Sequence, residues 1–426
     1  MRLFIVLLCL GVFAVEPVVC ADKTQTLITE QFVRYDPDYL ENRERYGARL
    51  NALSKQMAEL EAQGQELQCS KQIYLEAKWL HRYTAHWDDL VDKLDRLEVS
   101  FEDRDQSFAT EQLPTTGFWG TCYEAHFMRV GATIDALSGL FSRGHEPRYR
   151  LRVDGPLSTG KKLLVRLQDL LISDIANTGV NNRAELSSLL TSISQGVFKH
   201  YIRQGMVEQI DFRSDSTLET MSEAFRFFLS GAQDRDTGYW GAWYLVDGKV
   251  HKTVDLSMTY HIVSYTKGKG IAHWPQLIAT TFAIEPETYP YGWRHKGRYN
   301  NHHNYDVAKI YKYGWPYMNR EQLTKASSQV ASMLEWSLSN TVQPDGSFIH
   351  DPTFSDSLAD EYYFGVSFFD VVGYWNPERQ FWTEDKTSDD TTALCCKIRD
   401  RIDELGLSGW AADGAKQKLE RNCGEC

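Results

Sequence analysis

The segment FLSGAQDRDTGYWGAWY, residues 228–244, ends an apolar helical pattern with Gln233, Gly238 and Trp240. A second segment, LSNTVQPDGSF at residues 338–348, repeats the order of apolar residue, Gln, Gly and aromatic ring. Each suits a helix end, where Gln can bond the last free carbonyls, Gly takes a left-handed turn and the ring packs back on the helix. A motif that recurs along a chain indicates a fold built from repeated units.

The two segments resemble the QW motif of squalene and oxidosqualene cyclases, proteins of the α/α-toroid fold. Residues 116–120, TGFWG, are a candidate third copy. The resemblance implies an all-α fold, an (α/α)-toroid or barrel of inner and outer helices, with a deep cleft where loops from successive helix ends meet. It indicates architecture rather than chemistry, since the chain has neither a DxDD-type protonating motif nor the zinc-site spacing of prenyltransferases.

Apolar residues with helical spacing recur along most of the chain. Between residues 71 and 100 they follow steps of three, four and seven, which predicts one amphipathic helix capped by Ser70. Strand signal is scarce, and the hairpin that we expect lies near 243–252, turned by Asp247 and Gly248. Further helices are expected over the ranges 181–202, 216–232, 255–266, 273–284, 303–313, 320–341, 357–374 and 389–405.

The first residues have the pattern of a secretion signal. Residues 1–21 contain one Arg and then an apolar run from Leu3 to Val15, and the small Val19 and Ala21 place cleavage before Asp22. No later apolar run is long enough to cross a bilayer. We therefore expect a secreted or periplasmic protein without a membrane span.

The remaining chain divides into three expected parts. Residues 22–150 form an N-terminal helical region, which is either a domain of its own or the first repeats of the toroid. Residues 151–410 form the α/α-toroid domain. Residues 411–426 form a polar C-terminal tail that contains cysteines.

Six cysteines remain after such cleavage, and an even number in an oxidising compartment predicts disulfides. They are Cys69, Cys122, Cys395, Cys396, Cys423 and Cys426. We expect Cys69 to pair with Cys122, and the 395/396 pair to bond with the 423/426 pair. The alternative for residues 423–426, CGEC, is a redox motif, which a polar tail with no strand before it disfavours.

Charge and composition narrow the class of partner. The formal net charge is -12, and an acidic surface disfavours nucleic acid. Aromatic residues make up 13% of the chain. In a secreted protein this abundance suits ring stacking on sugars, although aromatic-rich cores have the same composition.

The residues best suited to chemistry lie in YPYGWRHKGRYNNHHNYD, residues 289–306. β-Elimination on a uronic acid needs a group that neutralises the carboxylate, a base for the C5 proton and an acid for the leaving oxygen. The Asn-Asn-His string is similar to that of an α/α-barrel alginate lyase family, which implies that Asn301 neutralises the carboxylate and His302 is a base. The tyrosine falls one residue later here, so Tyr305 has rivals as the acid. The rivals are Tyr260, Tyr299 and Tyr311.

Other side chains complete the predicted site. His261 would face this loop if inner helices line the cleft, and Arg294 and Arg298 are further groups for the carboxylate. The candidates for substrate binding are Asn300, Tyr260, Trp240, Trp274, Trp293 and Trp315. The simpler alternatives are that Asn301 caps a helix and that the tryptophans are buried.

We therefore predict a carbohydrate-active enzyme, a lyase acting on an acidic polysaccharide, with no cofactor. One alternative is a glycoside hydrolase that uses two carboxylates in the same cleft. Its candidates are Asp234, Asp236, Asp255, Asp306, Asp360 and Glu361, of which Asp255 also suits a helix N-cap. A metal site around His302 and Asp306, with His261 or His295, is a third reading. A non-catalytic toroid that binds a glycan or a protein is the fourth.

Overall fold

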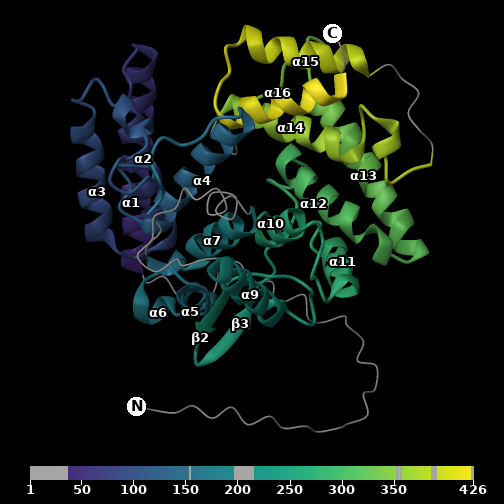
Figure 1. The fold of residues 1–426 in the computed structure, drawn as a ribbon, viewed down its shortest axis with the longest axis horizontal. Helices are drawn as coiled ribbons and strands as arrows, with labels where there is room; N and C mark the ends of the chain where they lie inside the picture. The colour runs from purple at the N-terminus through teal and green to yellow at the C-terminus, as the bar shows by residue number, and fades with distance from the viewer. Residues whose placement is uncertain are drawn as a thin grey trace.

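The structure is a computed structural model that describes residues 37–152, 155–195, 215–351, 355, 357–384 and 391–423. The predicted signal segment, residues 1–21, lies outside these residues. The described chain is mostly helical, with one small sheet (Figure 1), which confirms the all-α class. Among the described residues, no helix combines the length and the apolar character needed to span a membrane.

The α-helices of the described chain, in order, are α1 (Pro37–Ala62), α2 (Gln68–Tyr83), α3 (Trp87–Ser100), α4 (His126–Ser142), α5 (Gly160–Leu171), α6 (Ile175–Thr178), α7 (Arg183–Gln195), α9 (Asp215–Ala232), α10 (Leu256–Thr266), α11 (Trp274–Ala283), α12 (Asn301–Gly314), α13 (Arg320–Asn340), α14 (Leu358–Val372), α15 (Thr392–Glu404) and α16 (Trp410–Cys423). Short 3₁₀ turns are η3 (Ser107–Thr110), η4 (Gly155–Leu157), η5 (Trp315–Tyr317) and η6 (Pro377–Arg379).

The predicted hairpin is present. Strands β2 (Trp243–Val246) and β3 (Lys249–Lys252) pair antiparallel. Asp247 and Gly248 join them with positive φ angles of 49° and 73°, the conformation that a two-residue hairpin turn requires. The strand β1 (Ile172–Ser173), which the sequence did not indicate, adds to the edge of β2 in parallel.

Six helices follow one another in contact around the middle of the molecule. α4 packs on α7, α7 on α10, α10 on α12, α12 on α14, and α14 on α16. The last helix returns to the first, because Arg143 at the end of α4 reaches Asp413 of α16, with Nη1 and Oδ2 3.5 Å apart. Between these six, the chain passes through α5, α9, α11, α13 and α15 (Figure 1).

The motif at residues 228–244 holds the helices α9, α10 and α11 together. Gln233, after α9, donates from Nε2 to Gly238 O at 2.9 Å and accepts the N–H of Ala272 at 3.1 Å. The Trp240 indole N–H bonds Leu229 O of α9 at 2.9 Å. Gly238 has φ 72° and lies directly against the backbone of His273 at the start of α11. The motif is therefore structural. Gln233, which we expected to bond the last helix carbonyls, instead bonds Gly238 O and the Ala272 N–H, and the Trp240 indole N–H bonds the helix carbonyl.

The second copy repeats the close contact four helices later. Gly346, after α13, has φ 85° and its Cα faces the backbone of Lys397 and Ile398 in α15. Phe348 is buried and its ring packs edge-on against Tyr362 of α14. Each motif glycine thus follows one helix and lies against the helix after next: Gly238 follows α9 and contacts α11, and Gly346 follows α13 and contacts α15. A Cβ has no room at either position.

Two helix predictions were wrong. Residues 71–100 form α2 and α3 rather than one helix, because the backbone turns away at residues 84–86 and Ala85 N–H bonds Gly179 O at 2.7 Å. Ser70 lies inside α2 and is buried, so it is no cap. The supposed polar tail contains helix α16, which packs on α14 and α15.

The apolar side chains form two large clusters in the described chain. The smaller belongs to α1, α2 and α3 and is centred on leucines such as Leu90 and Leu94. The larger begins at Phe118 and takes in residues from α4 onward. The change of cluster therefore falls between Phe101 and Phe118. The division at residue 150 that the sequence favoured stays a prediction.

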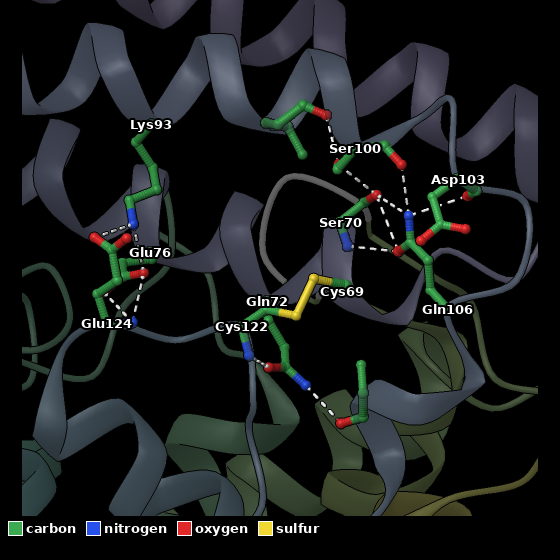
Figure 2. The surroundings of a disulfide bond; sticks show 12 residues. Cys69, Ser70, Gln72, Glu76, Lys93, Ser100, Asp103, Gln106, Cys122 and Glu124 are labelled. Atoms are coloured by element: carbon green, nitrogen blue, oxygen red, sulfur yellow. Dashed lines mark hydrogen bonds and ion pairs between the residues drawn. A yellow bond between two sulfur atoms is a disulfide. The ribbon is translucent and has the colours of Figure 1, made fainter.

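A disulfide fastens the first three helices to the rest (Figure 2). Cys69 of α2 is bonded to Cys122, in the segment before α4, with Cα atoms 5.5 Å apart. Beside it, Gln72 accepts the N–H of Cys122 at 2.9 Å and donates to Ala109 O at 2.9 Å. The predicted pairing of Cys69 with Cys122 is confirmed.

A buried ion cluster reinforces the same junction. Lys93 of α3 reaches Glu76 of α2 at 3.0 Å and Glu124 at 2.8 Å, as Figure 2 shows. Glu76 also accepts the N–H of Ala125 at 2.6 Å, just before α4. Buried charges are tolerated when each is paired and hydrogen-bonded in this way.

The second disulfide joins α15 to α16. Cys395 is bonded to Cys423 with Cα atoms 5.6 Å apart, which is one of the pairings expected between the two cysteine pairs. Cys396 is also disulfide-bonded, and Cys426 lies outside the described residues. These bonds place the cysteines in structural positions.

Candidate functional site

A cavity of about 590 Å³ lies between the six successive helices. α4, α7, α10, α12, α14 and α16 each contribute side chains to its wall, and α5, α9, α11, α13 and α15 contribute none. A second hollow of about 380 Å³ shares Asp135 and Thr191 with it and runs on between α4 and α7.

His261 is the best-defined basic group in this cavity. It lies on α10, and its Nδ1 is 2.7 Å from the carbonyl of Ser257. A carbonyl only accepts, so Nδ1 carries the proton and Nε2 carries the lone pair. Burial lowers the pKa of His261 to about 4. The ring is therefore neutral at pH 7 and able to accept a proton.

His302 lines the same cavity from α12. Its ring stacks on Phe364 of α14 with centroids 3.8 Å apart. Burial, and then the nearby charge of His261, lower its pKa to about 3. Its Nε2 lies 3.8 Å from Oδ2 of Asp306, which is too long for a hydrogen bond. The sequence prediction that His302 faces the site agrees with this placement.

A buried polar layer supports His302. Asp306 is fully buried, and Tyr289 donates its hydroxyl hydrogen to Oδ2 at 3.2 Å. Burial raises the pKa of Asp306 well above its usual range. The Tyr289 ring stacks on His303 with centroids 3.9 Å apart. This layer fills the space below the cavity, and Asp306 does not line it.

Protonated tyrosines stand beside the histidines. Tyr260 lines the cavity, 4.9 Å from the His261 ring and 5.4 Å from the ring of Tyr305, all between centroids. Burial raises the pKa of Tyr260 and of Tyr305 well above 10. Both hydroxyls therefore keep their protons at pH 7 and can donate one. Tyr305 itself is buried behind Tyr260.

Three predicted polar groups do not reach the cavity. Asn301 is buried, and its amide donates to Thr341 Oγ1 of the α13 end at 3.0 Å. Arg294 pairs with Glu285 at 2.6 Å. Arg298 is exposed on a turn that bridges to His295. The side chains of Asn301 and Arg294 are held by these partners, although the loop before α12 also contacts the start of α10, where the Leu256 N–H bonds Pro290 O at 2.7 Å.

Asn300, a predicted substrate group, is the N-cap of α12. Its side chain accepts the N–H of His302 at 2.8 Å, the bond expected of a capping Asn. The cap therefore falls one residue before Asn301, the residue that the sequence offered as an alternative cap. By starting α12 here, it sets His302 on the first turn.

The predicted tryptophan platforms are largely core residues. Trp240, Trp274 and Trp293 are buried, and Trp315 is half-buried with its ring edge-on to Phe381 at 5.2 Å. None of them lines the cavity. The exposed ring in the cavity wall is instead Trp410, which begins α16.

The sequence missed the contribution of α16. Its residues Trp410, Asp413, Lys418 and Arg421 all line the cavity. A signal was available, because the buried residues of this helix recur every fourth position. They are Ala411, Ala415, Leu419 and Cys423, a spacing that favours an amphipathic helix.

The carboxylates proposed for a hydrolase are mostly structural. Asp255 caps α10 by accepting the N–H of Met258 at 2.9 Å, and it pairs with Arg183 at 2.6 Å. Asp234 shapes its turn and binds Lys252 at 3.0 Å. Glu361 accepts the hydroxyl of Ser355 at 2.7 Å. Neither these residues nor Asp236 and Asp360 line the cavity.

A different carboxyl group, that of Asp135, lines the cavity. Asp135 of α4 reaches solvent through the cavity, yet the protein enclosing it raises its pKa to about 6. The second cavity carboxylate, Asp413, is engaged with Arg143. A carboxyl group with a raised pKa in a cleft is a candidate acid.

In the part of the chain that the structure describes, no three His, Cys, Asp or Glu side chains are grouped to hold a metal ion. Comparison of the chain with protein-family models, with curated protein sequences and with solved structures finds no significant match.

Proposed function

We propose that the helices from α4 to α16 form an (α/α)-toroid, with the six cavity helices inside and the intervening helices outside. The succession of contacts from α4 to α16, and the return contact between Arg143 and Asp413, support this architecture. The two glycine motifs also support it, because each glycine lies against the helix after next along the chain. The cavity then occupies the centre of the ring, where such folds have their cleft.

We propose that the protein is a secreted polysaccharide lyase, which cleaves a uronic acid-containing polysaccharide by β-elimination. One observation carries the proposal: a neutral imidazole with a defined lone pair, His261, lies beside a protonated phenol, Tyr260, in one cavity. Elimination needs a base and an acid close together on the substrate. The two disulfides agree with an oxidising compartment.

In the proposed reaction, Nε2 of His261 removes the proton at C5 of the sugar. The electron pair of that bond forms the C4=C5 double bond, and the bond from C4 to the bridging oxygen breaks. The Tyr260 hydroxyl gives its proton to the leaving oxygen. Tyr305, whose ring meets Tyr260 edge-on, stands behind as a hydrogen-bond partner. His302 supplies a second imidazole to the same substrate region.

The test is ultraviolet absorbance during incubation with a panel of polyuronides and glycosaminoglycans. Elimination creates an unsaturated sugar that absorbs, and hydrolysis does not. We expect a rising signal with the native chain, its loss in His261→Ala, and no change in the control His145→Ala, whose side chain is exposed outside the cavity. Absorbance that stays flat on every polymer would contradict the proposal.

A second candidate function is glycoside hydrolysis with Asp135 as the acid, since the pKa of this group is raised to about 6. New reducing ends without absorbance, lost in Asp135→Asn and retained in His261→Ala, would favour it. Binding of a glycan without new ends and without absorbance would instead identify a non-catalytic toroid.

A further inference from the structure

Three cationic side chains lie close together at the α16 side of the cavity. Lys418 and Arg421 line its wall, and Lys309 of α12 lies beside them. Lys418 Nζ is 4.1 Å from the centre of the Tyr363 ring, which also lines the cavity. Lys309 Nζ is 5.5 Å from the centre of the Tyr305 ring. On a chain with a net charge of -12, this gathering is unusual.

No carboxylate of the described chain pairs with any of the three. Lys418 donates only to Gly414 O, within its own helix, at 3.2 Å. Lys309 and Arg421 have no ion pair in the described residues, although other arginines and lysines do. Asp370, the acid that raises the pKa of both Lys309 and Lys418, is already shared by Arg379 and Asn422, each at 2.9 Å.

The charges are close enough to act on one another. Burial, together with the charges of Arg421 and Lys309 and against the opposing effect of Asp370, lowers the pKa of Lys418 to about 8. Three like charges with one acid acting among them repel, and a bound anion would relieve that repulsion. Arg adds a planar donor fork that matches a carboxylate or sulfate, and Lys a compact point charge.

We propose that Lys309, Lys418 and Arg421 form the subsite that binds the anionic groups, carboxylate or sulfate, of the polysaccharide. This inference rests on the proposed function for the identity of the polymer. It assigns the recognition of negative charge to α12 and α16, in place of Asn301, Arg294 and Arg298, which lie outside the cavity. Trp410, exposed at the same wall, offers a face for the adjoining sugar ring.

The test uses three proteins: the native chain, a double variant that carries both Lys418→Gln and Arg421→Gln, and a matched control, Lys416→Gln. Lys416 lies on the same helix but pairs with Asp403 and does not line the cavity. Calorimetry measures binding of polygalacturonate, of dextran sulfate and of neutral dextran at two salt concentrations. Far-ultraviolet circular dichroism checks that each variant is folded, and the single variant Arg421→Gln, at an exposed side chain, serves if the double variant is not.

We expect the native chain to bind at least one polyanion and not dextran. The double variant should bind that polymer about tenfold or more weakly and with a shallower salt dependence, and Lys416→Gln should match the native chain. The polymer that loses affinity identifies the ligand group as carboxylate or sulfate. Equal binding by the double variant and the native chain, or equal binding of dextran, would overturn the subsite.

Failure of this inference and failure of the proposed function give different results. Polyanion binding that depends on Lys418 and Arg421, with no absorbance change, supports the subsite and contradicts the lyase. A rising absorbance that the double variant reproduces at the native rate and affinity supports the lyase and contradicts the subsite.

Discussion

The Nδ1 atom of His261 lies 2.7 Å from the carbonyl oxygen of Ser257, one turn earlier on the same helix. This bond orients the imidazole from within α10 and does not depend on a distant partner. It also decides which nitrogen holds the lone pair. In the proposed reaction, the lone pair of His261 is therefore oriented before the substrate binds.

The pH dependence of elimination should report this base. Because burial lowers the pKa of His261 to about 4, the ring stays neutral as the pH falls through 6. We expect kcat/KM on a polyuronide to be flat on the acid side until the pH approaches about 4, and then to fall. A steady-state series across pH measures it. An acid limb with an apparent pKa near the ordinary ~6.5 would contradict the assignment.

A control is needed because the buried histidines also affect stability. Burial lowers the pKa of His261, His302 and His303, so the unfolded chain binds more protons than the folded one below about pH 6.5. These groups therefore reduce stability as the pH falls. Melting curves recorded at each pH separate loss of fold from protonation of the base.

The motif glycines should be critical to stability. We expect Gly238→Ala and Gly346→Ala to lower the free energy of unfolding through two effects. A left-handed residue with a side chain costs about 1–2 kcal/mol, and a Cβ forced against the backbone of α11 or α15 adds about 1–3 kcal/mol. Urea unfolding measures both variants.

Gly248 provides the matched control. Its φ is 73°, close to that of Gly238, but no atom lies within 4 Å of an added Cβ. Gly248→Ala should therefore show only the backbone cost. If all three variants lose the same free energy, the close contact between motif and helix is not what stabilises the fold.

The ion pair between α7 and α10 should behave as a buried one. Asp255 is fully buried and binds Arg183 through Nε at 2.6 Å and Nη2 at 3.1 Å. Asp255→Ala leaves Arg183 without its partner and removes the α10 cap, so we expect a loss of about 3–5 kcal/mol in the free energy of unfolding. The measurement is equilibrium denaturation.

An exposed pair gives the comparison. Glu59 lies 4.0 Å from Lys55 on α1, with both side chains largely in solvent. Glu59→Ala should change stability by no more than about 1 kcal/mol. A loss in Asp255→Ala as small as this would mean that water reaches the Arg183 site.

Removing the disulfide between Cys69 and Cys122 should weaken the junction of the first three helices. The bond closes a loop of 53 residues, for which the loop-entropy estimate is about 4 kcal/mol. We expect the double variant to Ser to melt at lower temperature than the native chain, by calorimetry. Reduction of the native chain also opens Cys395–Cys423, so it should lower the melting temperature at least as far. An unchanged melting temperature in the double variant would show that the ion cluster around Lys93 holds the junction alone.

Much of the local structure follows from neighbouring residues, and it could be predicted from the sequence. Asp255 caps a helix because its carboxylate reaches the N–H three residues on. Asp247 and Gly248 turn a hairpin because both adopt positive φ. The helical segments from α9 to α15 were found by apolar spacing, since burial on one face repeats with the helical period.

The break between α2 and α3 could not be predicted in this way. The residues at 84–86 include neither Gly nor Pro, and the helix ends there because a strand-like contact with Gly179 and Val180 replaces its hydrogen bonds. Such a partner is distant in the chain, so no local pattern records it.

The sequence by itself determined the helical class, the hairpin and the Asp255 cap, because each depends on backbone preferences or local spacing. Cysteine number predicted disulfides, and the structure decided which cysteines pair. Only the tertiary structure decided which side chains share the cavity. It brought His261 and His302 together with Lys418 and Arg421 of the last helix, and it left Asn301 and Arg294 elsewhere. The physical reason is that membership of a cavity depends on how helices far apart in the chain pack, and residue type alone carries no information on that contact.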